Sequence, residues 1–200
     1  MNPALLVIDI QHWFFQIPSF LTTEGLEKVD KLVENTNELT KFFKDNNLPI
    51  IHVLTVHSQD GSTRDLWGKQ NNSKVLMEGS KDIEELPNLI HYETDLKLIK
   101  TRTNSFLHTE LDNLLKGLEI DTVVVSGYST NKCVGITSIE ACERDYQVIL
   151  SEEATLGPQN DRVEAMKLIL KTYGIEPENN NIIIEKIKTE CKHKEIRGSV

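Results

Sequence analysis

The chain has 200 residues, and its shares of 38% hydrophobic and 26% charged residues are typical of a globular protein rather than a disordered one. Its formal net charge of −9 at pH 7 argues against binding to nucleic acids or anionic membranes, which usually involves a basic face. The three cysteines, Cys133, Cys142 and Cys191, are odd in number and widely spaced, so we expect neither a disulfide framework nor a paired-cysteine metal site. With no basic leader and no apolar run of membrane-spanning length, the sequence predicts a protein of the reducing cytoplasm.

Strand and helix patterns alternate along the first half of the chain. Residues 4–9 form a continuous apolar run that ends in an acid, and residues 49–56 form a second run; both are typical of buried parallel strands. Between them, residues 26–43 place apolar side chains on one helical face. Residues 58–95 are polar and contain three glycines and a proline, so we expect an irregular excursion with one short helix and a strand near residues 89–92.

The same alternation continues in the second half of the chain. Helices are predicted from their start and stop residues over residues 109–117, 131–145 and 161–173. Short apolar runs predict strands at residues 121–127, 147–150 and 181–185. Strands that alternate with helices indicate right-handed βαβ units. We therefore expect residues 1–200 to form a single domain, a three-layer α/β/α sandwich with a mainly parallel sheet.

Two charged residues stand at the ends of such segments. Asp9 ends the first apolar run, and in open parallel sheets ligands bind beyond the carboxyl ends of the strands. An acid at that place can be a general acid or base, although it can also cap a helix or end a strand in solvent. Lys100 ends the segment Leu96–Lys100. Beside a thiolate and a carboxylate, its ammonium would keep the sulfur ionised and orient the acid, whereas a lysine alone indicates the surface.

Cys133 follows the predicted strand at residues 121–127 and a short turn. Thr130 or Asn131 can cap the next helix, which places Cys133 in the first helical turn. The free N–H groups and the helix dipole there favour a thiolate and can stabilise an oxyanion. The alternative is a small buried hydrophobic residue, which is the interpretation we prefer for Cys142.

Three motifs in order along the chain resemble those of the isochorismatase-like cysteine hydrolase superfamily, and together they span about three quarters of the sequence. The first is ALLVIDIQHWF, an apolar strand followed by an aspartate, a glutamine and an aromatic residue. The second is KTRTNSF, and the third is VVVSGYSTNKCVGITSIEACERDYQVIL, which carries the cysteine. The resemblance implies a Rossmann-like sheet of strand order 3-2-1-4-5-6, with Asp9 and Cys133 at adjacent central strands, and a homo-oligomer.

The resemblance also implies the chemistry of the site. Asp9, Lys100 and Cys133 would form a catalytic triad, with a cis peptide bond between Tyr128 and Ser129. The backbone amides of Ser129 and Cys133 would form the oxyanion hole. The implied activity is hydrolysis of a carbon–nitrogen amide-type bond in a small molecule through a thioester intermediate.

We expect no cofactor and no metal ion. Nicotinamidases of this superfamily carry an Asp-x-His metal motif after the second strand, whereas this chain has Thr55 at the position of the acid before His57. His52, His57 and Asp60 are the alternative metal ligands, although His52 alternates into a strand and fits a satisfied core position.

Four residues are candidates for contact with the substrate, and two other functions fit the same sequence. Gln11 is a candidate polar contact, and Phe14, Trp67 and Tyr128 are candidates for an aromatic wall, although each can equally be a packing residue. One rival is an isochorismatase-type hydrolase of a vinyl ether, which does not need the cysteine. Another is a non-catalytic binding protein on the same fold. The expected partners are a small-molecule substrate and further copies of the chain, and neither a nucleic acid nor a membrane.

Overall fold

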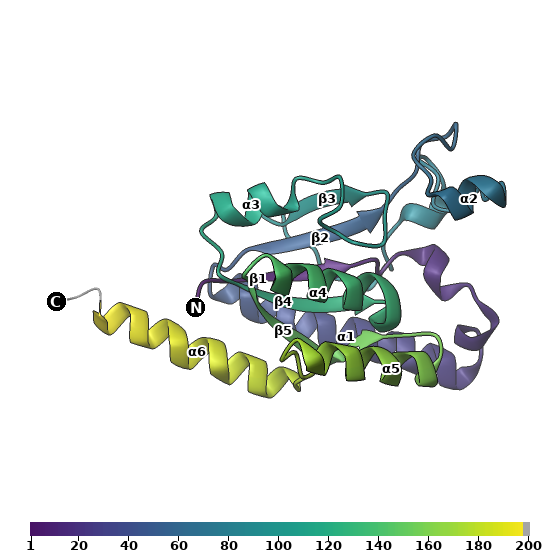
Figure 1. Ribbon diagram of the computed structural model, residues 1–200. Coiled ribbons are helices and arrows are strands. Elements are labelled where there is room, and N and C mark those ends of the chain that lie inside the picture. Colours follow the sequence, from purple (N-terminus) through teal and green to yellow (C-terminus); the bar gives the residue numbers. More distant parts are fainter. Residues whose placement is uncertain (198–200) are drawn as a thin grey trace.

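Figure 1 shows the computed structural model of the chain, which describes the backbone of residues 1–197 and the side chains of residues 1–190. Five parallel strands form one sheet in the order β3-β2-β1-β4-β5. The strands are β1 (Pro3–Ile8), β2 (Ile50–Thr55), β3 (Leu96–Lys100), β4 (Thr122–Tyr128) and β5 (Gln147–Leu156). β1 pairs with β2 on one side and with β4 on the other, so the strand order reverses at β1, as predicted.

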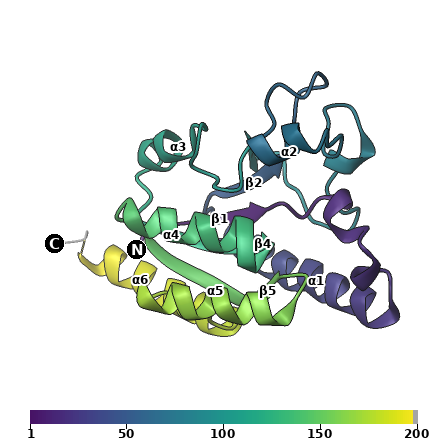
Figure 2. The same cartoon turned by 45° about the vertical axis from the view of Figure 1, so that its right-hand side comes forward.

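Helices cover both faces of this sheet, which confirms the three-layer prediction (Figures 1 and 2). One face packs against α1 (Thr23–Asp45) and α6 (Asn180–Arg197), and the other against α3 (Leu111–Gly117), α4 (Gly135–Glu143) and α5 (Asn160–Thr172). The short helical segments are η1 (His12–Phe15), η2 (Pro18–Phe20), α2 (Leu66–Gln70), η3 (Lys81–Ile83) and η4 (Thr130–Val134). Within the described residues, no helix combines the length and the apolarity needed to cross a membrane.

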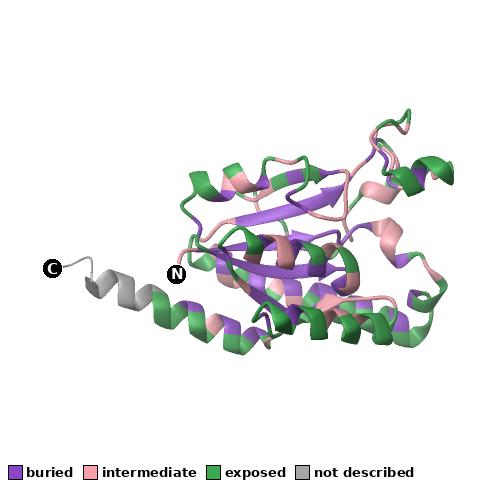
Figure 3. Cartoon of the chain, viewed as in Figure 1, coloured by how far each residue is buried: buried purple, intermediate pink, exposed green. Residues whose placement is uncertain are grey.

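The sheet is buried on both sides because its central strands carry apolar side chains without interruption. In β1, Leu6 and Ile8 pack on the face of α3 and α4, while Leu5 and Val7 pack on the face of α1 and α6. Figure 3 shows these strands as a continuous buried layer. An unbroken apolar run is the sequence pattern that a strand covered on both faces requires. The core therefore fixes β1, β2 and β4, whose carboxyl ends carry the candidate site.

The predicted sixth strand at residues 181–185 is wrong, because these residues belong to α6. Ile183 and Ile187 are both buried and lie four residues apart, whereas Ile182 is half exposed. This spacing places one apolar stripe of a helix against the sheet and α1. The side-chain amide of Asn180 supports the start of α6 by donating to the Asn35 carbonyl and to Glu38. The strand order in the described residues is therefore 3-2-1-4-5.

The excursion between β2 and β3 contains the predicted short helix, α2, which projects from the body of the molecule (Figure 1). The predicted strand near residues 89–92 is wrong, and that stretch is turn and irregular structure. Its backbone donors bond to side chains instead of a neighbouring strand: the N–H of Ile90 donates to Asn37 Oδ1 and that of Tyr92 to Asp95 Oδ2. The first of these contacts holds the segment against α1, and neither extends the sheet.

Candidate active site

Three strand ends bring polar side chains to one edge of the sheet. Asp9 follows β1 directly, while Thr55 and Lys100 are the last residues of β2 and β3 and lie opposite each other in register. The N–H of Asp9 still donates to the Val53 carbonyl at 2.9 Å, but its φ of 52° lies in the left-handed region, which few non-glycine residues adopt. The chain therefore turns sharply at the residue that carries the carboxylate.

Asp9 and Lys100 form a fully buried ion pair. Lys100 Nζ lies 2.7 Å from Asp9 Oδ2, and neither side chain is exposed to solvent. Burial works to lower the pKa of Lys100, but the charges of Asp9 and Cys133 outweigh this effect, and the pKa is raised. Lys100 is therefore a permanent cation at neutral pH. An ion pair desolvated to this degree persists only where each charge has further hydrogen bonds.

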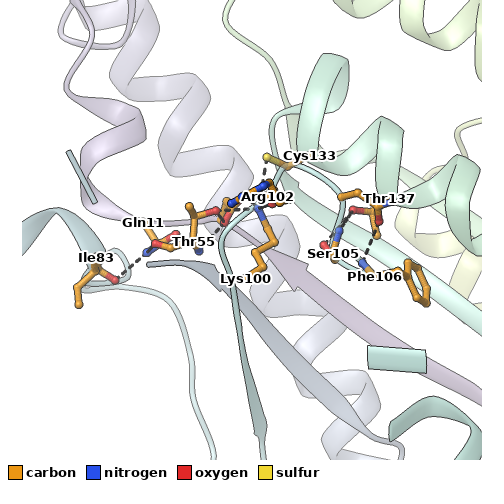
Figure 4. Close-up of polar contacts among 11 residues, drawn as sticks. Gln11, Thr55, Ile83, Lys100, Arg102, Ser105, Phe106, Cys133 and Thr137 are labelled. Carbon is orange, nitrogen blue, oxygen red and sulfur yellow. Dashed lines mark hydrogen bonds and ion pairs between the residues drawn. The ribbon is translucent and has the colours of Figure 1, made fainter. Parts of the chain in front are cut away.

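Cys133 completes the group from the other side of β1 (Figure 4). It lies in η4, a π-helical turn that starts after Ser129 and continues into α4, so it occupies the first helical turn, as predicted. The helix cap is Ser129 rather than Thr130 or Asn131. Lys100 Nζ lies 3.5 Å from Cys133 Sγ, and Cys133 is partly exposed. The structure therefore brings the three residues predicted from distant parts of the sequence into contact.

The pKa of the Cys133 thiol is raised, whereas its place in the first helical turn favoured a thiolate. Burial is the main cause that raises the pKa of Cys133 to about 12, and the negative charge of Asp9 and a hydrogen bond to it add to this effect. The ammonium of Lys100 lowers the pKa but does not compensate. A raised pKa favours the thiol over the thiolate at neutral pH. Such an arrangement suits a thiol that loses its proton to Asp9 as it attacks.

Thr55 also belongs to this cluster. From the sequence it was noted only because it stands where the acid of the Asp-x-His metal motif would be. Its hydroxyl donates to Asp9 Oδ1 at 2.8 Å and accepts from Lys100 Nζ at 2.7 Å, while its backbone N–H donates to the same Asp9 oxygen at 3.0 Å. Thr55 therefore links the two charges and fixes their orientation. Its position in the sequence could have indicated this role. Thr55 ends a predicted strand, as Lys100 does, and Asp9 lies at the end of another.

Gln11 lies next to the cluster, and its side-chain amide bonds to the backbone. Its side chain is fully buried, donates to the carbonyls of Thr55 and Ile83, and accepts the backbone N–H of Thr55 (Figure 4). This placement differs from the predicted substrate contact, because the amide is already saturated by backbone partners. On the opposite side, the carbonyl of Arg102 accepts from Lys100 Nζ at 3.1 Å and completes the shell of the ammonium.

The turn between β4 and η4 contains the predicted cis peptide bond between Tyr128 and Ser129. Just before it, Gly127 has a φ of +116°, and a Cβ at this position would lie 2.0 Å from the carbonyl oxygen of Ile8. Only glycine can take this conformation at such a close approach to the end of β1. Gly127 therefore allows the strand that leads to Cys133 to pass directly beside the strand that leads to Asp9.

Two of the three predicted aromatic residues lie together. The Phe14 ring packs 5.3 Å from the Tyr128 ring, which also contacts Phe15 and Phe20. Tyr128 is buried, and burial together with the nearby Cys133 raises its pKa, so its hydroxyl stays neutral. Trp67 lies apart on the projecting helix α2, and its side chain is 68% exposed. Phe14 and Tyr128 are therefore packed together, and Trp67 does not join them.

The three alternative metal ligands do not converge. His52 bonds to Glu85 through Nδ1 at 2.8 Å, and Asp60 accepts from Ser58 and Ser62 in an exposed turn. His57 is buried near the active site, where burial first and the charge of Arg64 second lower its pKa. It is therefore neutral at pH 7.

Comparison with known proteins identifies the family. A protein from Arabidopsis thaliana described as a probable inactive nicotinamidase is 28% identical over 181 residues, which cover 88% of this chain and 91% of that protein. The crystal structure of an isochorismatase family protein from Desulfovibrio vulgaris superposes with a TM-score of 0.81 at 23% identity, covering 94% of this chain and 98% of the other. The crystal structure of N-carbamoylsarcosine amidase from Thermoplasma acidophilum superposes with a TM-score of 0.75 at 25% identity. The match covers 90% of this chain and 96% of the amidase. The family model of the isochorismatase domain matches residues 3–180. The chain therefore belongs to the isochorismatase family of hydrolases, as its motifs predicted.

Proposed function

We propose that this protein is a cysteine hydrolase that cleaves a carbon–nitrogen amide-type bond in a small molecule. The observation that carries the proposal is the contact between Lys100 Nζ, the Asp9 carboxylate and Cys133 Sγ at the edge of the sheet. A base, a nucleophile and a fixed cation are together there, and the nucleophile is partly exposed. N-carbamoylsarcosine amidase shares the fold at 25% identity, which supports amide, carbamoyl or ureido compounds as the substrate class.

The chemistry follows from the charges of these residues. Asp9 takes the thiol proton while the sulfur attacks the substrate carbonyl, so that a carbon–sulfur bond forms and the carbonyl electron pair moves to oxygen. The amides of Ser129 and Cys133, at the start of the helix, would donate to that oxyanion. When the oxyanion collapses, the carbon–nitrogen bond breaks and the amine leaves with the proton held by Asp9. Asp9 then deprotonates a water molecule that attacks the thioester. The carbon–sulfur bond breaks, Asp9 returns the proton to Cys133 Sγ, and the acid product leaves.

Lys100 does not transfer a proton in this scheme. Its raised pKa keeps it charged, and its bonds to Asp9 and Thr55 hold the carboxylate toward the sulfur. Its positive charge also stabilises the sulfur when the proton leaves. Phe14 and Tyr128 are the proposed aromatic contacts of the substrate. Cytoplasmic location, a homo-oligomeric state and a single domain stay predictions from the sequence.

A non-catalytic role is the second candidate, because one relative is described as a probable inactive nicotinamidase. The two candidates separate in one experiment, in which the protein is incubated with a panel of amides, carbamoyl compounds and a vinyl ether. Acid-quenched samples are then searched by mass spectrometry for acylated cysteine peptides. We expect an acyl adduct on Cys133 with one class of amide. Cys133→Ala should lower turnover by at least about 1,000-fold, because it removes the nucleophile.

Cys142→Ala is the matched control, because Cys142 is a partly exposed free thiol in the same helical stretch. It should keep full turnover. Turnover that survives in Cys133→Ala, or a vinyl ether cleaved equally well by both variants, would reject the cysteine mechanism. Binding without any turnover across the panel would support the non-catalytic role.

A further inference from the structure

A second buried polar cluster lies on β2, apart from the active site. His52 precedes Thr55 by three residues and shares the sheet face of Ile50, which packs toward α1. The segment before β3 folds over this face and adds Glu85, His91 and Asp95. None of these four residues bonds to Asp9, Lys100 or Cys133 in the hydrogen bonds and ion pairs of the described residues. The cluster is therefore independent of the proposed mechanism.

Glu85 fixes the orientation of the His52 ring. His52 Nδ1 lies 2.8 Å from Glu85 Oε1, and the His52 side chain is only 3% exposed. A carboxylate at this distance accepts a hydrogen bond from Nδ1–H, and in the neutral imidazole Nε2 then keeps its electron pair. The same relation between a carboxylate and a histidine holds the ring in many metal sites, where it presents the other nitrogen to the ion.

The free nitrogen of His52 faces negative charge without a hydrogen bond. His52 Nε2 has no hydrogen-bond partner although it is buried, and it lies 3.5 Å from Asp95 Oδ2. An unprotonated nitrogen this close to a carboxylate oxygen is unfavourable unless a cation lies between them. His91 lies beside this gap, with its ring centroid 4.3 Å from that of His52. The gap therefore has the donor atoms of a cation site.

We propose that His52, His91 and Asp95 bind a divalent transition-metal ion of the zinc class, and that Glu85 positions His52 for it. One possible ligand atom from each of the three lies within 4.8 Å of the others, and no other such group of three occurs among the described residues. Zinc–ligand bonds of about 2.0–2.2 Å call for ligand atoms somewhat closer than this, so the ring of His91 would move inward. Its side chain is 44% exposed, which gives both the freedom to move and a path for the ion.

Imidazole nitrogen with carboxylate oxygen is a donor set that suits zinc and related ions, and water would fill the fourth position. The ion would join β2 to the segment that leads into β3. It would thereby brace the strand that ends at Thr55. The site differs from the Asp-x-His position considered in the sequence, because it includes neither Thr55 nor His57.

The test is titration of the full chain with Zn²⁺ alone, after treatment with a chelator, by calorimetry. All proteins carry Cys133→Ala, so that this thiol cannot compete for the ion. We expect one ion per chain and a Tm that rises with zinc concentration. His91→Ala and Asp95→Asn should weaken binding at least tenfold, and Glu85→Gln should weaken it about 10–100-fold, as found for residues that orient metal ligands. His108→Ala removes an exposed histidine outside the cluster and should change nothing.

Substitution by Co²⁺ adds a spectroscopic readout, because a site of nitrogen and oxygen ligands shows no thiolate-to-cobalt charge-transfer band. Absence of stoichiometric binding would overturn the proposal. Binding unaffected by His91→Ala, or a thiolate band with cobalt, would overturn it as well. NMR gives a further test. If both ring nitrogens of His52 carry protons in the presence of excess Zn²⁺, the proposal is overturned, because a buried imidazolium would then bridge Glu85 and Asp95.

Discussion

Strand β2 contributes to two buried polar clusters that differ in how completely their groups are paired. At its end, Thr55 joins Asp9 and Lys100 in a network where hydroxyl, carboxylate and ammonium all have partners at 3.1 Å or less. Three residues earlier, His52 has one paired nitrogen and one without a hydrogen-bond partner. A buried network that is fully satisfied holds its own geometry, whereas one with an open position requires a further group. The first cluster is therefore built to act by itself, and the second to receive a ligand.

Breaking the satisfied cluster should have the largest effect. Lys100→Met leaves the buried charge of Asp9 without its cation, so we expect a loss of about 3–5 kcal/mol in the free energy of unfolding. Turnover should fall with it, because Asp9 loses the group that orients it. Urea denaturation followed by far-UV circular dichroism measures the first effect, and the amide panel measures the second.

Lys97→Met is the control, since Lys97 lies on the same strand with its side chain exposed. It should change stability by less than about 0.5 kcal/mol. If the two variants unfold with equal free energies, Lys100 does not neutralise a buried charge on Asp9.

A smaller effect is expected from the hydroxyl that links the two charges. Thr55→Val removes both of its bonds, to Asp9 and from Lys100, and leaves two charged groups each short of a partner. We expect a loss of about 1–3 kcal/mol in the free energy of unfolding, with lower turnover. Urea denaturation and the amide panel again give the two numbers.

Thr40→Val provides the contrast within the same protein. Thr40 is also buried, on α1, but its hydroxyl has no hydrogen-bond partner. Valine should be neutral there or stabilise the protein, because an unpaired hydroxyl is removed at the same volume. If both substitutions cost the same, the network around Thr55 adds nothing beyond packing.

The sequence was informative where one residue determines one local feature. The apolar run before Asp9 predicted a strand buried on both faces, and the motif around Cys133 predicted a cysteine in the first turn of a helix. The convergence of Lys100 with Asp9 and Cys133 came only from the family resemblance, because no local pattern distinguishes a buried lysine from a surface one.

The predictions that were wrong or missing depend on contacts between distant segments. The run at residues 181–185 could not be assigned to a helix from its own letters, because the deciding contact is the packing of Ile183 and Ile187 against the sheet and α1. Likewise, His91 and Asp95 meet His52 only after the chain folds back from the excursion. Thr55 was overlooked because its partners lie 46 and 45 residues away. Such groups become visible only when strand register is known.

The last prediction concerns the protonation state of the sulfur. Burial and the charge of Asp9 raise the pKa of Cys133, and the charge of Lys100 lowers it. Asp9→Asn should therefore lower that pKa, because burial alone then opposes the effect of Lys100. Iodoacetamide reacts with the thiolate, so at fixed pH Cys133 should be alkylated roughly tenfold faster for each unit by which the pKa falls. Lys100→Met should act in the opposite direction. Mass spectrometry of the cysteine peptides gives both rates, with Cys142 as the internal reference. Slower alkylation of Cys133 in Asp9→Asn would show instead that the carboxylate already removes the proton in the resting enzyme.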